Sequence, residues 1–212
     1  MHGLGRTSLS MKRVQWTLES AGYKVVNASY PSRRYSVERL SEDYLAKTVA
    51  AIPAATPKVH FVTHSLGGIL VREYLSHHAI TNLGRVVMLA PPNHGSRLAD
   101  TLKRTAAGRW IMGPAGCELG TTAHDAPQRF GLVNFQLGII AGDRSLNPLF
   151  SRALQTPNDG KVSVESAKAA GMADFTVVHS SHTWMACRAE TLRQVLAFLR
   201  GGHFGTVRLG GA

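Results

Sequence analysis

The chain has 212 residues, of which 44% are hydrophobic and 17% are charged, and its formal net charge is +11. This composition predicts a folded globular protein and excludes a disordered chain, and no apolar run reaches the roughly 18 residues that a membrane-spanning helix needs. The basic residues are scattered, no run exceeds Arg33-Arg34, and no nucleic-acid-binding signature occurs. We therefore expect no nucleic-acid partner, whereas the positive charge favours weak association with an anionic membrane surface.

The length fits a single domain, which we place at residues 1–200 and follow with a C-terminal tail at 201–212. Two cysteines, Cys117 and Cys187, are too few for a disulfide framework, so we expect free thiols. The first residues lack the apolar stretch of a secretory signal, which slightly favours a cytoplasmic location.

Apolar runs and helical stripes alternate along the chain. Ser36 is a candidate N-cap, and Val37, Leu40 and Tyr44 then recur on one helical face. The same reasoning predicts strands at 25–30, 59–62, 85–90, 135–141 and 175–179, helices at 36–52, 66–74, 96–104 and 189–199, and a long loop at 105–133. Strands that alternate with helices form a mostly parallel sheet with helices on both faces, so we predict an α/β fold.

Ser65 stands where an apolar strand changes abruptly into a helix, in the segment Thr63-His64-Ser65-Leu66-Gly67. In a nucleophile elbow the serine adopts a strained conformation there, and small residues two positions away let helix and strand approach closely. Gly67 meets this requirement, whereas Thr63 replaces the usual glycine and predicts some crowding. A helix N-cap is the simpler interpretation of the segment by itself.

A serine nucleophile needs a histidine base, and that base needs an orienting carboxylate. His182 follows the strand at 175–179 and so lies at the same edge of a parallel sheet as Ser65. His64 adjoins the serine, but neighbours on an elbow point apart, and His60 and His179 fall inside predicted strands. Two aspartates are candidates for the acid: Asp143, which could instead cap a turn or pair with an arginine, and Asp159, which could instead belong to a simple turn.

Two backbone N–H groups are candidates for an oxyanion hole. Leu66 follows the serine at the helix start, and Leu4 lies in the opening His2-Gly3-Leu4 segment.

The ordered motifs resemble those of the α/β-hydrolases, and specifically of small bacterial lipases and esterases. The matching segments are HGLGR, THSLGG, APPNHGS, AGDRS, NDGKVSVESA and SSHTWM. The order Ser, Asp, His is the one this fold uses. The resemblance implies that the acid is Asp159 rather than Asp143, and that the PPNHGS stretch lines the active-site side.

The resemblance also predicts a central strand directly before the His-Gly segment, where this chain has only Met1. We therefore expect a gap in the sheet beside the strand at 59–62 and an unpaired edge there.

These observations predict a serine carboxylic-ester hydrolase with the triad Ser65, Asp159 and His182, acting on small-molecule or lipid esters. No metal motif occurs, so we expect no metal and no cofactor. A loop at 105–133 would form a mobile rim, which favours short and medium acyl esters. The alternatives are a thioesterase or acyltransferase with the same triad, and a non-catalytic hydrolase-like binding protein.

Overall fold

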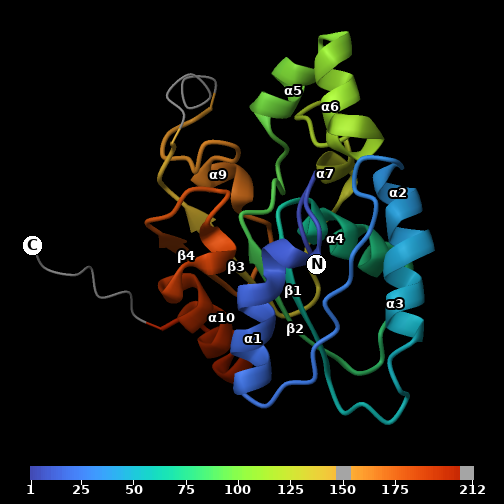
Figure 1. Cartoon of the computed structure of the whole chain (residues 1–212), viewed down its shortest axis with the longest axis vertical. Coiled ribbons are helices and arrows are strands. Elements are labelled where there is room, and N and C mark those ends of the chain that lie inside the picture. The colour runs from blue at the N-terminus through green and yellow to red at the C-terminus, as the bar shows by residue number, and fades with distance from the viewer. Residues whose placement is uncertain (147–153, 206–212) are drawn as a thin grey trace, which may run out of the picture.

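A parallel four-stranded sheet forms the centre of the molecule in the computed structural model, which describes residues 1–146 and 154–205 (Figure 1). The strands lie in the order β1-β2-β3-β4, and each neighbouring pair is parallel. Their bounds are β1 Val59–His64, β2 Leu83–Leu89, β3 Leu137–Gly142 and β4 Asp174–Val178. Four of the five predicted strands are thereby confirmed.

Helices and single turns connect and cover these strands. Their bounds are η1 Ser8–Met11, α1 Lys12–Ser20, α2 Val37–Leu40, the π-helical η2 Ser41–Leu45, α3 Ala46–Ala50, α4 Leu66–His77, α5 Arg97–Lys103, α6 Ala106–Cys117, α7 Ala126–Arg129, α9 Val164–Ala167, η3 Met185–Cys187 and α10 Ala189–Gly201. The predicted cap is confirmed, because the Ser36 hydroxyl accepts a hydrogen bond from the Arg39 N–H at 3.2 Å. No helix in the described part is long and apolar enough to cross a membrane.

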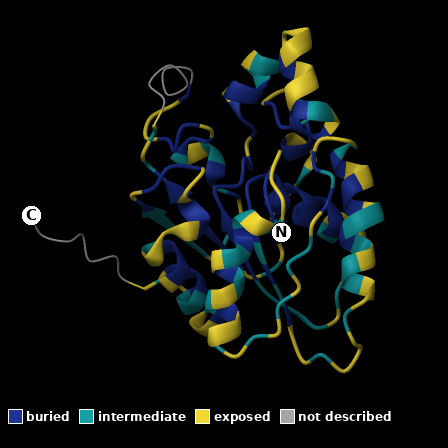
Figure 2. Ribbon diagram, viewed as in Figure 1, coloured by how far each residue is buried: buried dark blue, intermediate teal, exposed yellow. Residues whose placement is uncertain are grey.

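The sheet has a hydrophobic core on each face. Val86 and Met88 of β2 pack into the core beneath α2 and α4, whereas Val87 and Leu89 of the same strand pack into the core beneath α1 and α10. Both faces of β2 are therefore buried, which explains why its sequence shows no polar alternation. Figure 2 shows this arrangement as buried central strands inside exposed outer helix surfaces.

The prediction of a loop at 105–133 is wrong, because α6 and α7 lie within it. Its glycines permit close helix contacts rather than flexibility. A Cβ at Gly108 would lie 2.0 Å from the Leu102 carbonyl oxygen, and Gly113 has φ 67° at a kink inside α6. Only glycine meets these demands without strain.

Two assignments near the N-terminus also differ from the structure. Residues 25–30 form no strand, since the backbone N–H and the hydroxyl of Tyr30 bind His2 instead. The helix α1 was not predicted, although Met11, Val14 and Leu18 follow helical spacing and are buried.

The expected gap beside β1 is present in the described sheet, with Met1 occupying one position of it. The Met1 amino group donates to the Val62 carbonyl at 2.8 Å, and the His64 N–H donates to the Met1 carbonyl at 3.0 Å. These bonds continue a parallel ladder for one residue, so the edge is satisfied where β1 meets Ser65.

The C-terminal end of the described chain packs on the molecule. The predicted tail begins at Gly201, the last residue of α10, and Phe204 contacts Phe198 with ring centroids 5.0 Å apart. Residues 206–212 of that tail lie outside the described part. Both cysteines are free, as expected.

Candidate active site

Ser65 sits on a strained turn between β1 and α4. Its φ of 53° and ψ of −120° lie in a region that residues with a side chain rarely adopt, at a typical cost of about 1–3 kcal/mol. Its N–H donates to the Leu89 carbonyl at 2.8 Å, which anchors the turn to the end of β2. The backbone geometry is that of a nucleophile elbow.

Close packing around the elbow explains the residues on either side of the serine. A Cβ at Gly67 would lie 2.8 Å from the His2 carbonyl oxygen, so no larger residue fits without movement of the main chain. The predicted crowding at Thr63 is relieved by Gly68, where a Cβ would lie 3.3 Å from the threonine hydroxyl. That hydroxyl is buried and has no hydrogen-bond partner within the described residues.

Asp159 and His182 form a buried hydrogen-bonded pair. Their side chains lie 2.7 Å apart between Oδ2 and Nδ1, and the residues are only 2% and 5% exposed. The other carboxylate oxygen, Oδ1, accepts the N–H groups of Lys161 and Val162 at 2.9 and 2.8 Å. In the described part, the Asp159 carboxylate therefore accepts three hydrogen bonds. Since the carboxylate accepts from Nδ1, the Nε2 atom of His182 is left to accept a proton.

The other candidate acid lies elsewhere. Asp143 Oδ1 binds Nδ1 of His179 at 2.9 Å, rather than His182 or Arg144. Both partners are accessible to solvent, and the His179 side chain is 67% exposed. His179 was expected to be buried inside a strand, but β4 ends one residue earlier, at Val178. His60 lies in β1, as expected, where its Nδ1 accepts the Arg85 N–H.

The His-Gly segment lies directly against the elbow. A Cβ at Gly3 would be 3.2 Å from Ser65 Cβ, so the two segments pack main chain to side chain. The N–H of Leu66 opens α4 and has no acceptor within the helix. No acceptor for the N–H of Leu4 occurs in the described part either. Two backbone donors are therefore available on adjoining segments.

A second histidine belongs to this cluster, and the sequence reasoning set it aside. His64 is 5% exposed, its Nε2 lies 3.0 Å from the His182 carbonyl oxygen, and the two rings are 4.7 Å apart between centroids. Its ring lies against the loop that carries His182. Only the tertiary structure reveals the contact between His64 and His182.

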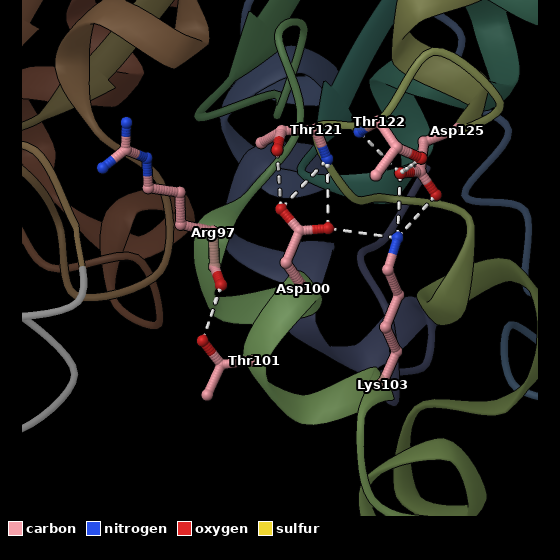
Figure 3. A network of polar contacts seen from close by, with 7 residues as sticks. All are labelled: Arg97, Asp100, Thr101, Lys103, Thr121, Thr122 and Asp125. Carbon is pink, nitrogen blue, oxygen red and sulfur yellow. Dashed lines mark hydrogen bonds and ion pairs between the residues drawn. The ribbon is translucent and has the colours of Figure 1, made fainter.

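The helices α5 and α6 lie beside the site, and α6 contacts the His-Gly segment. A Cβ at Gly116 of α6 would lie 2.8 Å from the Leu4 side chain, so α6 packs on the His-Gly segment. The pair itself is held to the following loop by the network in Figure 3. Lys103 Nζ contacts Asp100 and Asp125, whose carboxylates bind Thr121 and Thr122 respectively. Burial alone would raise the pKa of Asp125, but these bonds outweigh it and lower the pKa.

The PPNHGS stretch connects several elements. Asn93 is buried and accepts a hydrogen bond from Arg72 of α4 at 3.1 Å, while its own amide donates to the Ala167 carbonyl of α9. Burial lowers the pKa of Arg72 to about 10. No cluster of metal-ligating side chains occurs among the described residues.

Comparison with known proteins bears on the fold. No family model and no curated protein sequence matches the chain. Several solved structures are similar to this chain. The mature lipase BlEst2 of Bacillus licheniformis has a TM-score of 0.68 at 19% identity, and the match covers 93% of this chain and 86% of that one. Phospholipase PlaB of Legionella pneumophila has a TM-score of 0.71 at 18% identity, covering 96% of this chain and 59% of that one. Lipase B of Aspergillus fumigatus has a TM-score of 0.65 at 16% identity, covering 97% of this chain and 52% of that one.

The chain therefore has the α/β-hydrolase fold, as its ordered motifs predicted.

Proposed function

We propose that this protein is a serine hydrolase that cleaves carboxylic esters, with Ser65, Asp159 and His182 as its triad. The observation that carries the proposal is the buried 2.7 Å bond between Asp159 and His182, in a cluster with the strained elbow that bears Ser65. The solved structures that share the fold include lipases and a phospholipase, which supports the same reaction class.

In the proposed reaction, Ser65 Oγ attacks the acyl carbon while its proton passes to His182 Nε2. The ester C–O bond then breaks, and His182 returns that proton to the departing alcohol oxygen. Water attacks the acyl-enzyme and gives a proton to His182, which returns it to Ser65 Oγ as the carboxylic acid leaves. Throughout, Asp159 holds the imidazole in the Nδ1–H tautomer and stabilises its charged form.

The developing oxyanion has two proposed donors, the N–H groups of Leu4 and Leu66. Neither N–H has an acceptor among residues 1–146 and 154–205, and packing of the His-Gly segment against Ser65 brings the two segments together. Removal of one such donor typically lowers kcat by about 10²–10³-fold.

Labelling with a fluorophosphonate, followed by peptide mapping, tests the nucleophile. We expect the reagent to label Ser65, and we expect Ser65→Ala to remove both labelling and hydrolysis of p-nitrophenyl esters while the melting temperature is retained. A folded Ser65→Ala variant with parental turnover would contradict the triad. Comparing oxygen esters with matched thioesters, with and without an acceptor alcohol, separates an esterase from a thioesterase or acyltransferase. A parent that reacts with none of these points to a binding protein.

The mobile rim that favoured short and medium acyl esters is replaced by α6 and α7, so we propose no acyl chain length, but we do propose a weak attraction to anionic membranes. The helix α6 exposes Trp110, which is 77% accessible, and Ile111 beside the exposed Arg104 and Arg109, a combination suited to an anionic interface. A chain-length series of p-nitrophenyl esters measures the acyl preference directly, and sedimentation with anionic against neutral vesicles tests the proposed membrane attraction.

A further inference from the structure

The position of His182 is fixed from several directions at once. Its N–H donates to the Asp159 carbonyl at 3.0 Å, and its ring Nδ1 binds the Asp159 carboxylate. Its carbonyl oxygen is 3.0 Å from His64 Nε2. Asp159 therefore holds the N–H and the ring of His182, whereas His64, at the end of β1, holds its carbonyl oxygen.

The tautomer of His64 follows from its partner. A carbonyl oxygen only accepts hydrogen bonds, so Nε2 of His64 must carry the proton and Nδ1 must be the unprotonated nitrogen. That nitrogen faces the His-Gly segment, since a Cβ at Gly3 would lie 3.1 Å from it. The imidazole of His64 thus lies between the segment that bears the oxyanion donor and the loop that bears His182.

The surroundings keep this ring uncharged. Burial and the neighbouring His182 hold the pKa of His64 well below its ordinary value, and the nearby Lys161 and Arg6 act in the same direction. A charged His64 would repel the imidazolium that His182 must become during turnover. A neutral ring instead offers a donor without adding charge beside the base.

We propose that His64 is a positioning residue for the ester hydrolysis proposed above: its neutral Nε2–H holds the main chain of His182 against the elbow and keeps the base aligned with Ser65. The inference rests on that proposed function. Misplacement of a catalytic group by about 1 Å can cost about 10²-fold in rate, so the loss of this bond should affect kcat more than KM.

The test compares three substitutions on the full chain. His64→Leu removes the donor, whereas His64→Gln keeps an N–H donor near the position of Nε2. His60→Leu is the matched control, because His60 lies in the same strand and its ring accepts from the Arg85 N–H and contacts Tyr23, both outside the site. Turnover is divided by the fraction of sites that fluorophosphonate labels once labelling has gone to completion, so that unfolded protein does not count as lost catalysis.

We expect kcat per labelled site to fall about 10–100-fold in His64→Leu, with KM within about threefold, and to recover in His64→Gln to within about fivefold of the parent. His60→Leu should lower the melting temperature but keep the parental kcat. A loss in His64→Leu no larger than in His60→Leu, or an equal loss in His64→Gln, would overturn the proposal.

A second measurement does not depend on turnover. The proton between His182 Nδ1 and Asp159 Oδ2 should give a low-field proton NMR signal, assigned by its disappearance in Asp159→Asn. We expect the signal to shift or broaden in His64→Leu and to persist in His64→Gln and His60→Leu; an unchanged signal in His64→Leu counts against the proposal. A parent that neither hydrolyses esters nor reacts with the fluorophosphonate would refute the proposed function, and this signal would still decide the role of His64.

Discussion

Gly67→Ala should separate folding from catalysis at the elbow. The added Cβ would lie 2.8 Å from the His2 carbonyl oxygen and 3.0 Å from the Met1 carbonyl oxygen. Both are main-chain atoms, so no rotamer change relieves the contact and the His-Gly segment must move away from Ser65. Overpacking of this kind costs about 1–3 kcal/mol in stability, and the moved segment carries the Leu4 N–H, whose loss lowers kcat by about 10²–10³-fold.

Gly68→Ala is the matched control for this change. Its added Cβ would lie 3.0 Å from Met88 Sδ, 3.2 Å from Pro91 Cβ and 3.3 Å from the Thr63 hydroxyl, all side-chain atoms and none of them in the His-Gly segment. Both substitutions add alanine to α4 and so share the same gain in helix propensity, about 1 kcal/mol. We expect Gly67→Ala to reduce kcat per labelled site by about 10²-fold and Gly68→Ala to stay within about threefold of the parent. Equal kcat values for the two variants would refute this account of the oxyanion segment.

Three further changes test other parts of the structure. Asp159→Asn should lower kcat by about 10⁴-fold, because His182 would be held in the wrong tautomer. Asp143→Asn, whose side-chain partner in the described part is the exposed His179, should leave kcat near the parental value. The reverse ranking in steady-state assays would move the acid to Asp143. Burial lowers the pKa of the Met1 amino group from 8.0 to about 5. In a chain that starts at Met1, the unfolded state therefore binds one more proton than the folded state between these pH values, and the melting temperature should rise from pH 5 to pH 8. A chain with an acetylated amino terminus should lose that part of the rise, and equal pH profiles of the melting temperature for the two chains would contradict the prediction. Lys103→Met leaves the partly buried Asp100 and Asp125 without the cation that they share, so chemical denaturation should show a free energy of unfolding lower by about 1–2 kcal/mol. An unchanged denaturation midpoint would show that the network in Figure 3 does not stabilise α5.

The sequence by itself determined the elements whose signal is local. The runs that begin at Val59 and Val86 are apolar because most of their strand residues are buried. The Ser36 cap is a contact between near neighbours, so capping rules identify it. The order of the motifs along the chain likewise predicted the fold, because parallel strands present their carboxyl ends at one edge. The pairing of Asp159 with His182 followed from that order together with a resemblance.

Only the tertiary structure decided the features that depend on packing between distant segments. The glycines of α6 look like loop residues until Leu102 and Leu4 are seen to occupy the space that their side chains would need. His64 looked irrelevant because local geometry points it away from Ser65, yet 118 residues separate it in sequence from the carbonyl that it holds. No local pattern encodes a contact of that range, because it exists only once the sheet has aligned β1 with the loop after β4.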